Sequence, residues 1–404
     1  MGNEEFYASI DIGTSKISML VADIEEEKFH AVGYLRKDSK GVKDGKITNI
    51  ESVSKIIAEL IKEFDKDYKK GIKFVNVNIS DLHLNTSNQN RQISFGGRSK
   101  VITKSDVIEA IQNSSAGAVA SNKKKLKAVV NNFTVDDQVV DYPIGMKAEV
   151  LGVEVHMASV SNQSLNNIKK CLDECNIGTD HVILDSIASS TVCITQDDKD
   201  KGVCLLDIGA GVSNISVFSK GGVVFSHVFK IGGNSITENI AQVFNTSFTE
   251  AERLKLRYGS AILESTLADR LIEFEQLEVA DACYLSLHEL IFVLESSYKE
   301  ICTLVKRTLK TQKLDRALKS GFVIMGGASK IPQCETLLLR EFRVRTKVAT
   351  INSDLVSGDE KVLNDMDYFS AFGLLTFNKS EFYLQEEERV QKGKWDRFKD
   401  LIDL

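Results

Sequence analysis

The stretch Ser9-Ile-Asp-Ile-Gly-Thr-Ser-Lys-Ile-Ser18 returns in the second half of the chain, two residues longer, as Leu205-Leu-Asp-Ile-Gly-Ala-Gly-Val-Ser-Asn-Ile-Ser216. In each copy an apolar run with strand character ends in Asp, turns through Gly and small polar residues, and resumes as another strand. A phosphate chain needs backbone N–H groups that approach closely, hydroxyl groups, and acids that hold Mg2+, usually through water. Both copies supply these groups, so we interpret them as a duplicated phosphate loop.

Two similar α/β domains that face each other across a cleft would explain this repeat. The chain has 404 residues, enough for two domains with a sizeable core. Residues 82–162 are polar and strand-rich, with a helix near 105–120 that Ser105 could cap, and we interpret them as an inserted subdomain. We predict a first domain at 1–81 and 163–195, and a second domain at 196–378 with a small lobe at about 250–315.

Composition limits the classes of function. The formal net charge of −6 argues against a general nucleic-acid binder, which normally carries a basic excess. The seven cysteines include no CxxC pair, which indicates a reducing compartment. The acidic N-terminus does not resemble a signal peptide, and no apolar run approaches the roughly 18 residues that span a bilayer. We therefore expect a soluble, cytoplasmic body that binds no nucleic acid.

Two further glycine pairs and one charged pair fit the same cleft. Gly232-Gly233 precedes an amphipathic helix, whose N-terminus could face phosphate or ribose. Gly326-Gly327 follows a strand and could admit a flat base or a phosphate against its backbone. Glu252 and Lys255 share one helical face, either as a surface ion pair or as contacts for a nucleoside. Taken alone, each glycine pair would be better explained as a tight connection.

Together and in this order, these motifs resemble the superfamily of actin, sugar kinases and heat-shock ATPases. More narrowly, the chain resembles the FtsA family of bacterial cell-division proteins over nearly its whole length, through residues 202–209, 232–241, 251–259 and 368–375. The resemblance implies an actin-like fold: two duplicated, ribonuclease-H-like α/β domains with an inserted subdomain and a C-terminal amphipathic helix.

The resemblance also implies ATP and Mg2+ as ligands. Asp11 and Asp207 would flank Mg2+, probably through water, while Glu252 and Lys255 would touch the adenosine. Asn214 stands where the family more often has Asp, and it cannot act as a carboxylate base. We therefore expect no catalytic residue and at most a weak ATPase. The candidate nucleotide-binding residues are Asp11, Gly13, Thr14, Ser15, Lys16, Asp207, Gly209, Ala210, Gly211, Ser213, Gly232, Gly233, Asn234, Glu252, Lys255, Gly326, Gly327 and Ala328.

The tail has its own pattern. A Glu- and Lys-rich linker at 379–393 leads to residues 394–404, where Trp395, Phe398, Leu401 and Ile402 share one helical face. Such a helix could dock on its own domain. The family resemblance favours a helix that lies on the membrane surface, with several tails acting together in one assembly.

The resemblance implies a polymer-forming adaptor that tethers FtsZ, the tubulin-like division polymer, to the inner face of the cytoplasmic membrane at midcell, together with other division proteins. The FtsZ tail would bind the small lobe, with Lys299, Lys306 and Arg307 as candidate contacts. One alternative is a sugar kinase or exopolyphosphatase, which needs a carboxylate base that we cannot identify from the sequence. Another is a PilM-like pilus-assembly protein, which would share the inserted subdomain but not need the tail.

Overall fold

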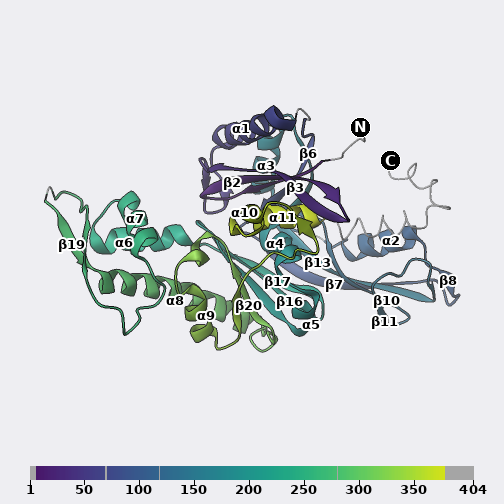
Figure 1. Cartoon of the computed structure of the whole chain (residues 1–404). Coiled ribbons are helices and arrows are strands. Elements are labelled where there is room, and N and C mark those ends of the chain that lie inside the picture. Colours follow the sequence, from purple (N-terminus) through teal and green to yellow (C-terminus); the bar gives the residue numbers. More distant parts are fainter. Residues whose placement is uncertain (1–5, 69–70, 118, 280, 378–404) are drawn as a thin grey trace.

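Two mixed β-sheets, one above the other in Figure 1, form the frame of the molecule. The computed structural model describes residues 6–377 except 69–70, 118 and 280. The first sheet has the order β14-β6-β1-β2-β3-β22 and the second β17-β16-β15-β20-β21. The first contains β1 (Tyr7–Ile12), β2 (Lys16–Glu25), β3 (Lys28–Asp38), β6 (Phe74–Ile79), β14 (Gly178–Leu184) and β22 (Val356–Ser357). The second contains β15 (Val203–Ile208), β16 (Ser213–Ser219), β17 (Gly222–Phe229), β20 (Gly321–Met325) and β21 (Thr346–Val348).

The same hairpin occupies the centre of both sheets. β1 and β2 are antiparallel with Asp11 opposite Ser18, and β15 and β16 are antiparallel with Asp207 opposite Asn214. A parallel strand flanks the first strand of each hairpin, β6 beside β1 and β20 beside β15. This shared topology confirms the duplicated, actin-like α/β fold that the repeated loop predicts.

Helices cover the sheets where the sequence has apolar residues at helical spacing. In the first domain, α1 (Ile50–Tyr68) buries residues 53, 56, 57, 60 and 64 and packs against α3 (Asn162–Glu174). In the second domain, α9 (Cys334–Phe342) lies against β21, and α5 (Gln196–Lys201) against β16. The small lobe, at the left of Figure 1, consists of α6 (Gly233–Phe244), α7 (Phe248–Tyr258), β18 (Leu271–Phe274), β19 (Cys283–Ser286) and α8 (Leu287–Thr311).

Two helices join the domains. α4 (Asp185–Cys193) and α11 (Phe369–Phe377) pack against each other, α11 also on β1 and α4 also on β15 and β16. Successive side chains of β15 point to opposite faces of the sheet. Leu205 therefore packs in the core around these helices, while Leu206 packs in the core of the small lobe. α4 and α11 approach closely, since a Cβ added at Gly373 would lie 2.2 Å from the carbonyl oxygen of Ala188. The hydroxyls of Thr191 and Thr376 lie 2.6 Å apart across the same contact.

The last described segment belongs to the first domain. β22 pairs in parallel with β3, and α10 (Glu360–Leu363), η2 (Met366–Tyr368) and α11 follow it. The backbone oxygen of Asp367 accepts a hydrogen bond from Ser18 Oγ at 3.1 Å. This segment lies in the range that we predicted for the second domain, yet it completes the first sheet and its core.

The inserted subdomain forms a sheet of its own, at the lower right of Figure 1. Its helix, α2 (Lys104–Ser114), begins after Thr103, whose hydroxyl accepts a hydrogen bond from Asp106 N while the Asp106 carboxylate accepts one from Thr103 N. The cap is therefore Thr103 rather than Ser105, because this reciprocal pair fixes the start of the helix. The helix ends at Ser114, before the predicted residue 120. The strands are β7 (Asn85–Ser94), β9 (Lys123–Lys125), β10 (Val129–Val135), β11 (Gln138–Val140) and β13 (Val150–Ser161), with β8 (Lys100–Val101) and β12 (Lys147–Ala148) paired separately.

The predicted linker at 379–393 and the predicted helix at 394–404, with Trp395, Phe398, Leu401 and Ile402, lie outside the described residues. In the part of the chain that the structure does describe, no helix combines the length and the apolar character needed to cross a membrane.

Replacing Gly373 with Ala should destabilise the chain, because the added Cβ would collide with the backbone of α4. We expect the free energy of unfolding to fall by about 1–3 kcal/mol, measured by urea denaturation at equilibrium. Gly117→Ala is the control, since a Cβ there meets nothing within 4 Å. Equal effects of the two substitutions would contradict the close contact between α4 and α11.

Candidate functional site

The two predicted phosphate loops adopt the same turn. They are also equally long, since Asp11 lies opposite Ser18 and Asp207 opposite Asn214, so the prediction of two extra residues in the second loop was wrong. Gly13 N donates to Lys16 O at 2.9 Å, and Gly209 N donates to Val212 O at 3.0 Å. A Cβ at either glycine would lie 2.9 Å from the carbonyl oxygen that its own N–H contacts. The turn therefore has little space for a side chain at either position, which explains the repeated Gly.

The loops meet across the domain boundary. A Cβ added at Gly211 of the second loop would lie 2.6 Å from Thr14 Oγ1 of the first. Thr14 Oγ1 also accepts a hydrogen bond from Gly45 N at 3.1 Å, in the turn between β4 (Val42–Lys43) and β5 (Lys46–Ile47). Asp44 of the same turn forms an ion pair with Lys230 of the second domain at 3.2 Å. The packing of Thr14 against Gly211 and the Asp44–Lys230 ion pair thus connect the two halves at the loops.

A cleft of about 420 Å³ lies between the domains at these loops. All of the candidate nucleotide-binding residues line it except Ser213 and Gly232. Ser213 is fully buried, and its hydroxyl donates to Ile231 O at 2.8 Å. A Cβ at Gly232 would lie 2.6 Å from Gly209 O. These two residues fix the second loop onto the start of α6 rather than facing the cleft.

Three carboxylates are buried together in the cleft. Asp11 and Asp207 end the central strands, and Asp185, the first residue of α4, lies between them. Asn78 Nδ2 donates to Asp11 Oδ1 at 2.5 Å and to Asp185 Oδ1 at 3.4 Å. Asn214 Nδ2 donates to Asp207 Oδ2 at 3.1 Å and to Asp185 Oδ2 at 3.4 Å. The same arrangement thus recurs on each side of Asp185.

Sequence reasoning missed Asp185. It supplies the cleft carboxylate that we could not identify, and its sequence signal was its place directly after the apolar stretch Val182-Ile183-Leu184. Asn214, which we noted as unable to serve as a base, instead donates hydrogen bonds to Asp185 and Asp207.

Burial makes these carboxylates difficult to ionise. Burial, followed by the nearby charge of Asp185, raises the pKa of Asp11 to about 8. Burial and Asp185 also raise the pKa of Asp207 well above its ordinary value. A divalent cation would offset this repulsion, and carboxylate oxygens suit a hard ion such as Mg2+. Among the described residues, no group of three acidic, His or Cys side chains could hold a metal ion. A metal ion in this cleft would therefore take part of its ligands from water and phosphate.

The Glu252–Lys255 pair is not a solvated surface pair. Lys255 is buried and forms an ion pair with Glu252 at 2.7 Å. Its Nζ also donates to Gly233 O at 3.1 Å and to Thr237 Oγ1 at 2.7 Å. Lys255 therefore fixes α7 to the first turn of α6 while it lines the cleft.

The cleft also has an apolar wall, which sequence reasoning did not predict. It consists of Leu256, Ile331 and Pro332 together with the ring of Tyr298, whose hydroxyl donates to Ala328 O at 2.6 Å. Gly326 has a φ of +93°, and a Cβ there would lie 2.2 Å from Asp207 Oδ1. A Cβ at Gly327 would meet nothing within 4 Å, so this glycine leaves open space against the wall.

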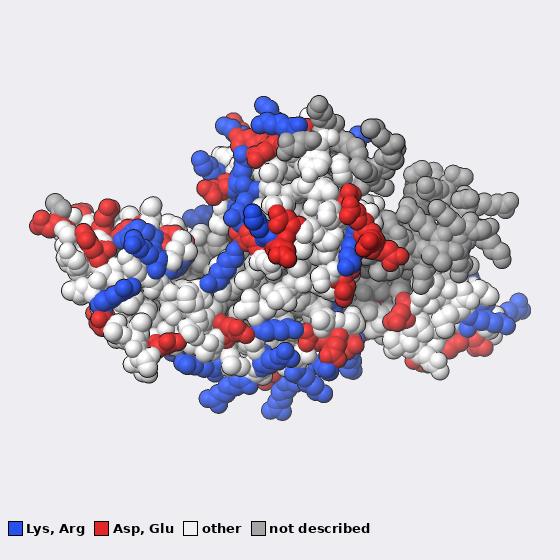
Figure 2. All heavy atoms as spheres, in the orientation of Figure 1, with Lys and Arg blue, Asp and Glu red and all other residues white. Residues whose placement is uncertain are grey.

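The three candidate contacts for FtsZ lie on α8, outside the cleft. Lys299 pairs with Glu295 at 2.6 Å, and Lys306 pairs with Glu341 at 2.5 Å. Arg307 lines a separate groove between α8, β17 and the inserted subdomain. On the face in Figure 2, Lys and Arg side chains gather along the lower edge of the second domain, while acidic and basic side chains alternate elsewhere.

Known proteins resemble this chain along most of its length. A family model described as cell division protein FtsA matches residues 204–373, and a model of the SHS2 domain inserted in FtsA matches residues 82–159. The cell division protein FtsA of Pseudomonas aeruginosa is 29% identical over 370 residues, covering 91% of this chain and 88% of that protein. FtsA of Escherichia coli K12 is 26% identical over 409 residues, covering 97% of this chain and 96% of that protein.

Solved structures share the fold. A chain of the PilM-PilN type IV pilus biogenesis complex matches with a TM-score of 0.63 at 15% identity, covering 91% of this chain and 97% of that chain. MreB5 of Spiroplasma citri, solved bound to ADP, matches with a TM-score of 0.59 at 14% identity, covering 95% and 98%. At these identities the likeness concerns the fold alone.

The stability of the nucleotide-free protein should fall as the pH rises. Because the folded-state pKa of Asp11 is raised, its contribution to stability is fully present below the unfolded value of 3.8 and is lost as the pH rises through about 8. We expect the melting temperature to fall between about pH 4 and pH 8 and to level off above that, and Mg2+ with ATP to raise it more near pH 8 than near pH 4. Thermal unfolding measured across this range checks both effects.

Asp185→Asn removes the charge that faces Asp11, so its melting temperature should depend less on pH. Asp315→Asn changes an exposed carboxylate outside the cleft and serves as the control. An unchanged pH dependence in Asp185→Asn would contradict the coupling between these acids.

Proposed function

Because the chain belongs to the FtsA family of cell-division proteins, we propose that it is an ATP-binding adaptor that polymerises and tethers FtsZ to the cytoplasmic face of the membrane at the division septum. The observation that carries the nucleotide part is the group of buried carboxylates between two loops that adopt the same turn. The sugar-kinase, exopolyphosphatase and PilM-like alternatives are not favoured, because both matching family models are those of FtsA.

The nucleotide would lie along the cleft with its phosphates at the two loops. Backbone N–H groups of both loops, the hydroxyls of Thr14 and Ser15, and the Lys16 ammonium would meet the phosphate oxygens. Glu252 and Lys255 would orient the nucleoside, and its base would lie against Gly327 and the apolar wall. Since residues from both domains would contact one ligand, binding would favour the closed arrangement.

Mg2+ would be held near Asp11 and Asp207 through water, where it would neutralise phosphate charge. Asp185 gives the cleft a carboxylate that can hold a water molecule or accept its proton. Any ATP hydrolysis would therefore depend on Asp185 rather than on Asn214. We propose that bound ATP acts mainly by controlling conformation and assembly.

Membrane attachment would rest on the C-terminal helix. Full burial of its four large apolar side chains, Trp395, Phe398, Leu401 and Ile402, would contribute at most roughly 6–12 kcal/mol. Partial insertion and the ordering of the tail remove much of this free energy. Stable attachment would thus need several tails, which polymerisation supplies.

FtsZ would bind the small lobe through its acidic tail. The ion pairs of Lys299 and Lys306 keep part of their positive charge engaged with Glu295 and Glu341. Among the described residues Arg307 has no acidic partner, so we place it first among the three candidate contacts.

Gly327→Leu should abolish nucleotide binding while leaving the fold intact. The glycine lines the cleft, and the space beside it contains no protein atom within 4 Å of an added Cβ. We expect the affinity for a fluorescent ATP analogue to fall at least about tenfold, with unchanged urea denaturation in the absence of nucleotide. Equal affinity in both proteins would contradict the proposed position of the base.

Co-sedimentation with anionic lipid vesicles in the presence of Mg2+ and ATP tests the membrane part. The intact chain should sediment with the vesicles, and Trp395→Glu should remain in the supernatant, because a charge on the apolar face opposes insertion. Trp395→Phe, which keeps an aromatic side chain, is the control. Equal sedimentation of Trp395→Glu and the intact chain would refute the membrane adaptor while leaving nucleotide binding untouched.

A further inference from the structure

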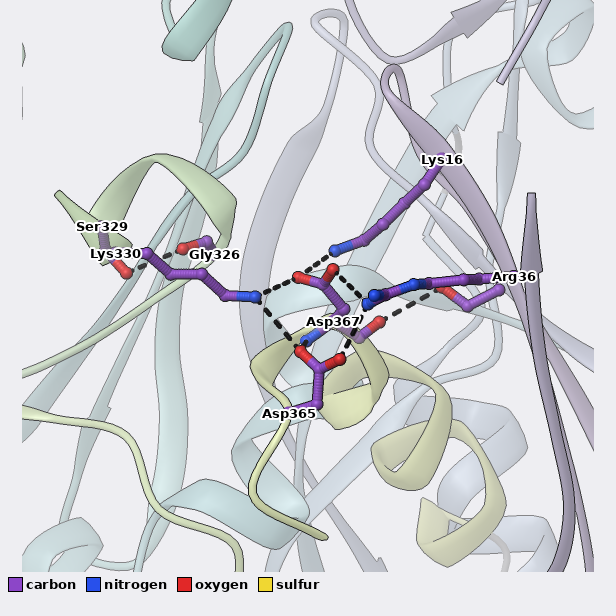
Figure 3. Close-up of polar contacts among 8 residues, drawn as sticks. Lys16, Arg36, Gly326, Ser329, Lys330, Asp365 and Asp367 are labelled. Carbon is purple, nitrogen blue, oxygen red and sulfur yellow. Dashed lines mark hydrogen bonds and ion pairs between the residues drawn. The ribbon is translucent and has the colours of Figure 1, made fainter. Parts of the chain in front are cut away.

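Five charged side chains converge at the edge of the cleft, and Figure 3 shows them pointing toward one another. Lys16 and Arg36 come from the first sheet, and Asp365 and Asp367 from the segment that packs on it. Lys330 comes from the second domain, where it ends the short helix η1 (Gly327–Lys330) after β20. The cluster therefore spans the boundary between the two domains.

Lys330 of the second domain forms ion pairs with both acids of the first domain, Asp365 and Asp367. Lys330 Nζ lies 2.6 Å from Asp367 Oδ1 and 3.1 Å from Asp365 Oδ1. Arg36 lies 2.7 Å from the other oxygen of each carboxylate. Lys16 Nζ contacts the same Asp367 Oδ1 that Lys330 contacts. Two ammonium groups from different domains thus share one carboxylate oxygen.

Both sides of the cluster are firmly supported. Asp367 N donates to Asp365 Oδ1 at 3.1 Å, and Ser18 Oγ donates to Asp367 O at 3.1 Å. On the opposite side, Ser329 Oγ donates to Gly326 O at 2.8 Å and fixes η1 at the end of β20.

The acids at the centre are largely screened from water. The Asp367 side chain is only 17% exposed. Burial alone would raise its pKa, but Lys16 and Lys330 together lower that pKa below the ordinary value. A partly buried network of this kind is stronger than an isolated surface ion pair.

We propose that Lys330 and the pair Asp365–Asp367 form a latch across the cleft that retains bound nucleotide, and that the nucleotide phosphates strengthen it by drawing Lys16 away from Asp367. This inference rests on the proposed nucleotide site. The two ammonium groups repel each other and compete for one oxygen. When phosphate engages Lys16, Asp367 Oδ1 is left to Lys330 and the repulsion falls. Phosphate therefore binds the latched form more tightly than the open form, which favours closure.

The test is the rate at which the full chain releases a fluorescent ATP analogue when chased with excess ATP. Lys330→Met should raise the dissociation rate about threefold to tenfold. Lys330→Arg keeps the charge and should stay near the wild-type rate. Lys347→Met is the matched control, because Lys347 pairs with Asp198 at 2.7 Å within the second domain. This control should release the analogue at the wild-type rate.

Asp365→Asn distinguishes the loss of the latch from the loss of a direct contact with the ligand, because Asp365 does not line the cleft while Lys330 does. It should also speed release, and combining it with Lys330→Met should add less than the product of the single effects. A fully multiplicative double variant would overturn the latch, and so would an unchanged rate in Lys330→Met.

An adenosine analogue without phosphates tests the role of Lys16. Lys330→Met should speed its release less than it speeds release of the ATP analogue, since adenosine offers Lys16 no phosphate. If Lys330→Met sped the release of both ligands equally, phosphate would not strengthen the latch and that part of the proposal would be overturned. If the wild-type chain bound neither analogue, the proposed function itself would fail; if it bound them and released them at the same rates in every variant, only the latch would fail.

Discussion

The cleft depends on the burial of Asp11, Asp185 and Asp207 in one space between two sheets. Charges removed from water must be compensated, and the amides of Asn78 and Asn214 compensate them only in part. The pKa values of Asp11 and Asp207 are both raised, so the free site favours a proton or a cation. A ligand that brings phosphate with a divalent cation suits both the acids and the N–H groups of the loops.

The central helices connect this constraint to the rest of the molecule. α4 places Asp185 at its first residue, and its position depends on the close contact of Ala188 with Gly373 of α11. Behind Asp185, the hydroxyl of Ser186 lies 2.7 Å from that of Ser216, which lies 2.9 Å from that of Ser226. Ser226 in turn lies 3.5 Å from the Nε2 atom of the buried His156 in the inserted subdomain. Buried polar contacts thus reach from the cleft to the inserted subdomain.

The sequence predicted those parts of the site that a short stretch of chain determines. Both Asp-Ile-Gly turns lie where the repeat indicated, because the tight turn at Gly13 and Gly209 requires Gly locally. The glycine pair at 326–327 lines the cleft as its place after a strand suggested. Asp185 and Asp367 were missed, since an acid next to an apolar stretch is only a weak local signal and both residues reach the cleft only through the packing of α4, η2 and α11. The burial of Lys255 could not be predicted either, because it depends on how α7 packs on α6. The cap of α2 was predictable, since Asp106 three residues after Thr103 completes a capping box.

Hydrogen–deuterium exchange of the full chain, with and without Mg2+ and ATP, tests most directly whether one ligand joins the two halves. The account predicts that backbone amides at 13–16, at 209–213 and at 326–330 become protected together, at the same concentration of ATP. Protection of one loop without the other, or of neither loop, would contradict a single site shared by both domains.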